Sequence, residues 1–450
     1  MAQKSEFNRR AFLKRAGATA LAAGASAGSV SLITAAAQEP ATGRSFDFDT
    51  PYNRFGTNSV KWDQPIRNFN CPDLIAGMGI ADMDFRAAPC ITRALAERCR
   101  HENWGYLEIP QEFTGSIVAW NKKRYGLAID AATIVLTTGV HPGIISALKA
   151  FCPAGTRVLL NTPTYDGFYG DLRYGNLLPE DVPMRLADGR YSLDFDEFER
   201  HISQSTNAYI LCNPQNPTGN VWSADDLLRI GEICLKHRVV VLADEIHCDF
   251  VMPGQKYTPF ASLPDKAVVD NSLTFKAASK SFSLAAMKNG WYFSTNPELL
   301  AKAKANNRAD ITTLSMVANM AALTEGAEWL DQLLPYIEGS HNLVASYVGA
   351  NMPLVKYAKP QGTYLCWLDV TAVAERIGAR QKAAAASKPE KAVTPEQIVQ
   401  TWFVENARVA LNPGSSYGTS GQDHMRMNIA TSRRTLRKAL ESMAEALNKL

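Results

Sequence analysis

Short apolar runs that end in polar turns constrain the fold of this 450-residue chain most strongly. They occur in TIVLTTGVHPGIISALKAF (133–151), RVLLNTPTYDGF, AYILCNPQNPTG and RVVVLADEIHCDF. A strand that is apolar without alternation is covered on both faces, as in a parallel sheet between two layers of helices. The sequence therefore predicts an α/β fold with a mostly parallel sheet, and ligands of such sheets collect at the carboxyl ends of the strands.

Polar residues follow these runs at fixed distances. Asn216 stands in NPQNPTG, Asp244 follows 28 residues later in VVVLADEIH, and Lys280 lies another 36 residues on. The surrounding stretch, TFKAASKSFSLAAMKNGW (274–291), holds three lysines among small and apolar residues. Taken alone, the stretch favours ordinary solvated lysines, as we expect for Lys276, and the family resemblance given below implies that Lys280 is the reactive amine.

Composition excludes two other classes of function. The 47 Lys and Arg residues nearly balance the 44 Asp and Glu, and they are scattered along the chain, which argues against nucleic-acid binding. The eight cysteines include no Cys-x-x-Cys pair and the seven histidines form no ligand-spaced cluster, so we expect no metal site. Most cysteines stand in apolar contexts, and a disulfide between Cys90 and Cys99 is left open.

The first 37 residues resemble a twin-arginine export signal. Arg9 and Arg10 precede an Ala/Gly/Ser-rich run, and AAA at 35–37 offers a small-x-small cleavage site. We expect a mature protein that begins near Gln38, is exported by the twin-arginine translocation machinery and resides in the periplasm. Because this pathway carries folded proteins, the signal also hints at a bound prosthetic group.

The remaining sequence divides into three parts. We predict an N-terminal arm with part of a small domain at 38–100, a large domain at 101–335 and a C-terminal small domain at 336–450. In the last part GTYLCWLDV predicts a strand, SRRTLRKALESMAEALNKL predicts an amphipathic terminal helix, and the Ala/Lys-rich stretch 376–395 predicts a solvated insertion.

Together with Tyr165 and Arg426, this order and spacing resembles the fold-type I pyridoxal phosphate enzymes of aminotransferase class I/II, from about residue 50 to 445. The finer match is to the MalY/PatB branch, the cystathionine β-lyase-like proteins, and it rests on RFGTNSVKWD (54–63), ADMDF (81–85), WGY (104–106), DEIHCD (244–249) and ARVALNPGSSYG (407–418). The resemblance implies pyridoxal 5'-phosphate as cofactor. It also implies a mostly parallel, seven-stranded type of sheet between helices, with a smaller α+β domain.

The resemblance assigns roles around the cofactor ring. Lys280 would hold the cofactor as a Schiff base and, once freed, move the substrate α-proton. Asp244 would keep the pyridine nitrogen protonated, Asn216 and His247 would bind the phenolic oxygen, and Tyr165 would stack on the ring. Taken singly, Asp244 could instead be a helix cap, and His247 or Tyr165 a packed core residue.

Further roles concern the phosphate and the substrate. The backbone N–H groups of Gly139 and Val140 at a helix start would bind the phosphate, with Lys288 as its cation. Arg426 would bind the substrate α-carboxylate through its forked guanidinium, and Tyr106 would reach into the neighbouring subunit's site, which implies a homodimer. Singly, Lys288 could be a solvated lysine, Arg426 a surface ion-pair partner and Tyr106 a packing aromatic.

One position departs from the family pattern. The family usually carries Ser or Thr three residues before the Schiff-base lysine, where it contacts the phosphate, and this chain has Ala277. A phosphate hydrogen bond is thereby lost or replaced, at a cost of about 1–3 kcal/mol if nothing compensates.

The reaction is not fixed by the cofactor. Export away from cytoplasmic methionine biosynthesis favours transamination of an amino acid or of an amino-acid-bearing metabolite, such as a maturing siderophore side chain. The alternative is a carbon–sulfur β-lyase of the cystathionine or cysteine-conjugate type, to which the MalY/PatB resemblance points. A non-catalytic pyridoxal phosphate-binding regulator is a third interpretation, against which the retention of Lys280, Asp244 and Arg426 together argues.

Overall fold

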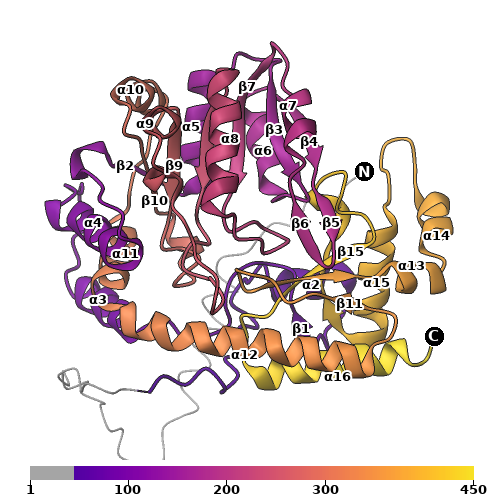
Figure 1. Ribbon diagram of the computed structural model, residues 1–450. Helices are drawn as coiled ribbons and strands as arrows, with labels where there is room; N and C mark the ends of the chain where they lie inside the picture. The colour runs from indigo at the N-terminus through magenta and orange to yellow at the C-terminus, as the bar shows by residue number, and fades with distance from the viewer. Residues whose placement is uncertain (1–44) are drawn as a thin grey trace, which may run out of the picture. The chain divides into compact units, whose positions relative to one another are not determined.

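A seven-stranded sheet lies at the centre of the computed structural model, which describes residues 45–450 (Figure 1). The strands run in the order β2-β10-β9-β8-β7-β3-β4, and β10 is antiparallel to both neighbours while the other pairs are parallel. Their bounds are β2 (Val135–Thr137), β3 (Arg157–Thr162), β4 (Leu178–Pro183), β7 (Thr206–Cys212), β8 (Val240–Asp244), β9 (Ser272–Lys276) and β10 (Gly290–Phe293). The predicted mostly parallel sheet is confirmed.

Helices cover both faces of this sheet, which explains the unbroken apolar runs. In β8, Val240 and Leu242 belong to the core formed with α5, α6 and α10, whereas Val241 and Ala243 belong to the core formed with α7, α8 and α9. Every residue of the strand must therefore be apolar until it ends. The helices are α5 (Val140–Phe151), α6 (Gly167–Tyr174), α7 (Phe195–Arg200), α8 (Ala224–Lys236), α9 (Lys266–Asp270) and α10 (Pro297–Ala305).

A second, four-stranded antiparallel sheet runs in the order β11-β12-β15-β14 and packs on C-terminal helices. Its strands are β11 (Lys356–Tyr357), β12 (Leu365–Asp369), β14 (Asn412–Pro413) and β15 (His424–Asn428). The helices are α13 (Thr371–Arg376), α14 (Ala379–Ala386), α15 (Pro395–Ala407) and α16 (Arg433–Leu447). The strand predicted in GTYLCWLDV and the amphipathic terminal helix are confirmed as β12 and α16. The predicted insertion contains α14, which buries Ala379 and Ala383, and is otherwise largely exposed beyond that helix.

The segment before residue 101 contributes to both parts of the molecule. β1 (Ala76–Gly77) pairs in parallel with β13 (Val409–Ala410), and α2 (Asp63–Phe69) precedes it. In contrast, α3 (Pro89–Cys99) packs with α4 (Gln111–Tyr125) and α11 (Thr313–Glu325). A short hairpin, β5 (Arg185–Ala187) with β6 (Arg190–Ser192), completes the strands of the described residues. The predicted domain boundaries remain predictions, and the predicted signal at 1–37 lies outside the described residues.

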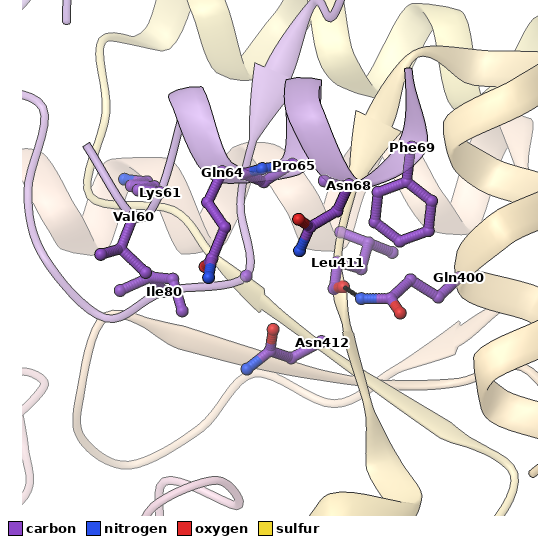
Figure 2. A pocket seen from close by; sticks show the side chains of 12 residues that line it. Val60, Lys61, Gln64, Pro65, Asn68, Phe69, Ile80, Gln400, Leu411 and Asn412 are labelled. Carbon is purple, nitrogen blue, oxygen red and sulfur yellow. Dashed lines mark hydrogen bonds between the residues drawn. The ribbon is translucent and has the colours of Figure 1, made fainter. Parts of the chain in front are cut away.

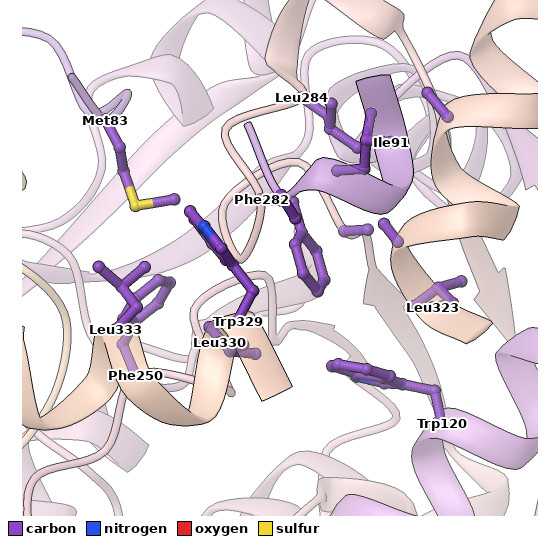
Figure 3. Close-up of a cluster of buried hydrophobic side chains, with 14 of the residues drawn as sticks. Met83, Ile91, Trp120, Phe250, Phe282, Leu284, Leu323, Trp329, Leu330 and Leu333 are labelled. Atoms are coloured by element: carbon purple, nitrogen blue, oxygen red, sulfur yellow. The ribbon is translucent and has the colours of Figure 1, made fainter. Parts of the chain in front are cut away.

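An aromatic cluster joins α12 (Ala327–Asn351) to the loop that follows Lys280 (Figure 3). The rings of Phe282 and Trp329 stack with centroids 5.8 Å apart, and Trp120 meets Phe282 edge-on at 5.7 Å. Packing of Phe282 on these tryptophan rings therefore supports the loop that follows Lys280. All eight cysteines, Cys90 and Cys99 included, are free thiols. Between residues 45 and 450 no helix has the length and apolar character needed to span a bilayer.

Truncation of Trp329 tests the importance of this aromatic cluster. We expect Trp329→Ala to lower the free energy of unfolding by about 3–5 kcal/mol, because a large, fully packed side chain leaves a cavity. Chemical denaturation at fixed protein concentration measures the change. Tyr174→Ala, which truncates a side chain that is largely exposed, serves as the matched control and should alter stability by less than about 0.5 kcal/mol. Equal stabilities of the Trp329 variant and wild type would contradict the prediction.

Candidate active site

Parallel register brings the predicted polar residues to one edge of the sheet. Asp244 is the last residue of β8, opposite Cys212 at the end of β7 and Phe275 near the end of β9. Asn216 lies in the loop that follows β7, and Lys280 lies in the turns that follow β9. Residues that are 64 positions apart in the sequence, from 216 to 280, therefore meet at the carboxyl ends of three neighbouring strands.

The side chain of Lys280 is half-buried, and a backbone carbonyl holds its amine. Its Nζ donates to the oxygen of Ala81 at 2.9 Å, and the hydroxyl of Tyr364 donates to the same oxygen at 3.0 Å. Burial, assisted by the positive charge of Arg426, lowers the pKa of Lys280 to about 8. An amine with this pKa exchanges protons readily near neutral pH, as a general acid or base must.

The segment Gly79–Asp84, which carries the Ala81 carbonyl, is bound along its length by β15. The Nη2 of Arg426 donates to the oxygen of Gly79 at 2.6 Å. The side-chain amide of Asn428 donates to the oxygens of Ile80 and Asp82, both at 2.6 Å. The smaller sheet therefore fixes the backbone that contacts Lys280.

Ion pairs fix the same segment from its other end, and the pair between Lys61 and Asp84 is buried. Lys61, whose amine is fully buried, lies 2.8 Å from Asp84, and Arg54 reaches Asp82 at 2.8 Å and Asp84 at 3.0 Å. The indole of Trp62 also donates to Asp84 at 2.9 Å. These residues belong to RFGTNSVKWD and ADMDF, so two motifs of the predicted branch act on each other across this segment.

Arg426 is almost completely buried, with 2% of its surface exposed. Its Nη1 donates to the side-chain oxygen of Asn216 at 3.1 Å, and its guanidinium lies 5.0 Å from the centroid of the Tyr417 ring. Its Nε has no hydrogen-bond partner within the described part of the chain. The interpretation of Arg426 as a surface ion-pair residue is wrong, because the side chain is buried beside Asn216.

The pKa values of Asp244 and His247 are shifted from their ordinary values. Burial raises the pKa of Asp244 to about 6, although its bond from the Ile246 amide at 3.1 Å favours the carboxylate. Burial, with the charges of Lys280 and Arg426, places the pKa of His247 well below its usual range, so the ring is neutral. The buried Nδ1 of His247 has no hydrogen-bond partner among residues 45–450. A hydrogen-bonding atom on a ligand would satisfy it.

The start of α5 forms a cradle for an anion. Gly139 precedes the helix with φ 140°, and no side chain caps the first amides. A Cβ on Gly290 would lie 3.0 Å from the carbonyl carbon of Gly139 and 3.2 Å from the amide of Val140, so only glycine lets β10 approach this closely. Lys288 is exposed two residues before Gly290. Free amides and a nearby cation suit a phosphate.

Ala277, at the position where the family usually carries Ser or Thr, packs in the apolar core. It is buried in the core between the sheet and α5. The methyl group therefore fills apolar space, and it brings no donor for the phosphate.

Tyr165 lies beside a histidine that the sequence did not single out. The Nε2 of His141 is 3.2 Å from the Tyr165 hydroxyl, and its Nδ1 is 2.7 Å from Asp171. His141 stands one residue after Val140, so its place in the first turn of α5 was the available signal. Tyr106, in contrast, is fully exposed on segment 102–110, which is neither helix nor strand, and is not brought to the other residues.

Lys276 is not the solvated lysine that was expected. Its Nζ donates to the Tyr257 hydroxyl at 3.1 Å, lies 4.2 Å from the Tyr125 ring centroid and is 3.7 Å from Glu245. The side chain ends β9, where every residue is buried, so a cage of two tyrosines and a carboxylate replaces water. Glu245 of this cage directly follows Asp244 in the sequence.

A cavity of about 100 Å³ borders the segment Gly79–Asp84 (Figure 2). Its lining includes the carboxamides of Gln64, Asn68 and Asn412 together with Ile80. Because Gly79 lines this cavity and also accepts from Arg426, the cavity and the site share one stretch of backbone.

The fold and this geometry define a fold-type I pyridoxal phosphate-dependent enzyme. The chain matches the family described as "Aminotransferase class I and II" over residues 75–443, and it belongs to that family. It is 34% identical over 409 residues to cystathionine β-lyase PatB of Bacillus subtilis, covering 89% of this chain and all of PatB. It is 30% identical over 410 residues to Protein MalY of Escherichia coli, covering 89% and 99%.

A solved structure shows the same fold. The pyridoxal phosphate-bound C–S lyase of Staphylococcus hominis matches with a TM-score of 0.79 and 27% identity, covering 90% of this chain and 99% of that one. The predicted resemblance to the MalY/PatB branch is thus confirmed. The unpartnered Nδ1 of His247, the uncapped amides at the start of α5 and the lowered pKa of Lys280 all fit the cofactor.

Borohydride reduction tests the role of Lys280. After incubation with pyridoxal phosphate and reduction, we expect a stable cofactor adduct on the peptide that contains Lys280, because a primary amine of lowered pKa reacts with the aldehyde. Mass spectrometry of a digest locates the adduct. Lys280→Ala should lose it, whereas Lys266→Ala, at an exposed lysine, should retain it. An adduct that persists in the Lys280 variant at another lysine would overturn the assignment.

Removing the Asp244 charge should stabilise the cofactor-free protein. In the folded state the pKa of Asp244 is about 6, above the ordinary value of 3.8, so the folded state binds this proton more tightly than the unfolded state. The stability that the bound proton contributes is lost as the pH rises through 6. The free energy of unfolding of Asp244→Asn should therefore exceed that of wild type by up to about 3 kcal/mol at pH 8 and by less at pH 5. Denaturant unfolding at both pH values measures the difference.

Asp310→Asn, at an exposed aspartate, is the control and should follow the wild-type pH dependence. An Asp244 variant less stable than wild type at pH 8 would show that the carboxylate stabilises the fold.

Proposed function

We propose that this enzyme is a carbon–sulfur β-lyase, which cleaves the Cβ–S bond of cystathionine or another cysteine conjugate to release a thiol, pyruvate and ammonia. The observation that carries the proposal is the identity with cystathionine β-lyase PatB over the whole length of that relative. The match to a solved C–S lyase at a TM-score of 0.79 supports it. The interpretation preferred from sequence alone, transamination, thereby becomes the second candidate.

Several residues would bind the cofactor and substrate. Pyridoxal phosphate, when bound, supplies an electron sink for negative charge at the substrate Cα. Asp244 would face the ring nitrogen with its carboxylate, and His247 and Asn216 would hydrogen-bond the ring oxygen. Arg426 would bind the substrate carboxylate with the guanidinium atoms that now contact Asn216 and Gly79.

Lys280 would move the protons. Its neutral amine takes the proton from the substrate Cα, and as an ammonium group it then stands ready to protonate the departing sulfur. The overall reaction consumes one water: the conjugate and water give thiol, pyruvate and ammonium. The pKa of about 8 suits both roles, since each protonation state is populated near neutral pH.

Transamination would use the same residues to bind the substrate and to move its α-proton. It would leave the C–S bond intact and pass the substrate amino group on to a 2-oxo acid, chemistry that the bound cofactor would supply. The family description favours this second candidate at the level of the class, and a periplasmic address would favour it too. A non-catalytic regulator would need none of the buried charge at Lys280, Asp244 and Arg426.

Two further features belong to the proposal. Residues 1–37 would direct the folded protein to the periplasm through the twin-arginine pathway. Tyr106, fully exposed in the single chain, would enter the site of a second copy in a homodimer. An exposed aromatic on an extended segment suits such an exchange between subunits.

Product analysis separates the two reactions. We expect the purified holoenzyme to release pyruvate and a thiol from L-cystathionine, while amino transfer to 2-oxo acids stays near background. Lys280→Ala should reduce pyruvate release at least about 100-fold, because the general acid–base group is gone. Lys266→Ala is the matched lysine control and should retain activity. Amino transfer without pyruvate would replace the lyase by the aminotransferase.

A further inference from the structure

A three-residue chain of contacts stands beside the candidate cofactor site. The hydroxyl of Tyr165 is 3.2 Å from Nε2 of His141, whose Nδ1 is 2.7 Å from a carboxylate oxygen of Asp171. The rings of His141 and Tyr165 lie with centroids 5.3 Å apart at 41°. The Asp171 side chain is only 5% exposed, whereas the His141 side chain is 40% exposed.

The backbone leaves room for this arrangement. A Cβ on Gly167 would lie 2.5 Å from Cε1 of His141 and 2.7 Å from Cε1 of Tyr165. Any other residue at 167 would push the two rings from their places. The histidine is therefore fitted between a glycine, a tyrosine and a buried carboxylate, from the first turn of α5 and the start of α6.

Charged groups surround His141 from three elements. Asp171 on α6 and Asp244 at the end of β8 attract its proton, and Lys280 after β9 opposes it. Burial alone would lower the pKa of His141, but the bond to Asp171 and the two carboxylates outweigh burial and raise it. In return, the positive charge of His141 favours the ionised form of Asp244.

We propose that His141, fixed by Asp171, is a positioning residue that orients the Tyr165 ring at the cofactor and, when protonated, acts electrostatically on Asp244 and Lys280. The proposal rests on the cofactor site of the proposed function and is independent of which reaction follows. Its consequence is that Lys280 loses a proton more easily, and Asp244 stays ionised, while His141 is charged.

The pH dependence of the bound cofactor's visible absorbance tests this proposal in the substrate-free holoenzyme. Two uncharged variants differ in shape: His141→Phe keeps a ring against Tyr165, and His141→Asn does not. Both should move the midpoint of the absorbance titration upward by about half a pH unit or more, because a cation near Lys280 is lost. Either variant alone suffices if the other fails to fold.

A second measurement addresses the orientation of Tyr165. Titration of the cofactor-free protein with pyridoxal phosphate should give a dissociation constant about 2–10-fold higher for His141→Phe, because the hydrogen bond to the tyrosine hydroxyl is gone. The matched control is His201→Asn, which removes a histidine held by Glu180 and Glu197 elsewhere on the chain. It should leave both measurements at their wild-type values.

The outcomes separate the proposals. If His141→Phe titrates on the wild-type curve, His141 only fills space and the electrostatic role is overturned. If both variants shift the midpoint downward, the sign of the argument is wrong. A wild-type protein with no visible cofactor band would instead refute the proposed cofactor site, whereas a normal band without β-elimination would refute the lyase and leave the role of His141 standing.

Discussion

The register of three parallel strands determines where the chemistry of this enzyme takes place. Because β7, β8 and β9 end side by side, Asn216, Asp244 and Lys280 come to one edge although they are far apart in the sequence. That register depends in turn on helices that bury both faces of the sheet. The core and the site are thus consequences of one requirement, that each strand be apolar along its length and polar only beyond its end.

The site also concentrates ionisable groups away from water. Lys61, Asp84, Asp244 and Arg426 are all buried, and each is paired or bonded within the described residues. Such burial disfavours charge unless partners compensate, which is why the pKa of Asp244 rises and that of Lys280 falls. The protein therefore gives up stability at Asp244, where a buried carboxylate is held at the carboxyl end of β8.

The sequence predicted the elements whose signals are local. Unbroken apolar runs predicted the sheet, and residue spacing with the family resemblance placed Lys280, Asp244, Asn216 and Arg426 at one site. Contacts made by backbone atoms, or between segments far apart in the chain, leave no local pattern in the sequence from which they could be predicted. The Ala81 carbonyl that binds Lys280 is invisible in a sequence, because any residue has one. Lys276 was misjudged because its cage is assembled from Tyr125, Tyr257 and Glu245, which come from separate segments.

One stretch of main chain, Gly79–Asp84, offers acceptors to Lys280, Arg426 and Asn428 at once. A displacement of that stretch therefore disturbs Lys280, the proposed proton carrier, and Arg426, the proposed carboxylate anchor, in the same motion. Natural or engineered changes at Arg54 or Lys61, which tether it from outside, will alter turnover and substrate affinity as a linked pair. Evolution of a new substrate range in this branch must then either leave the tether intact or change both properties together.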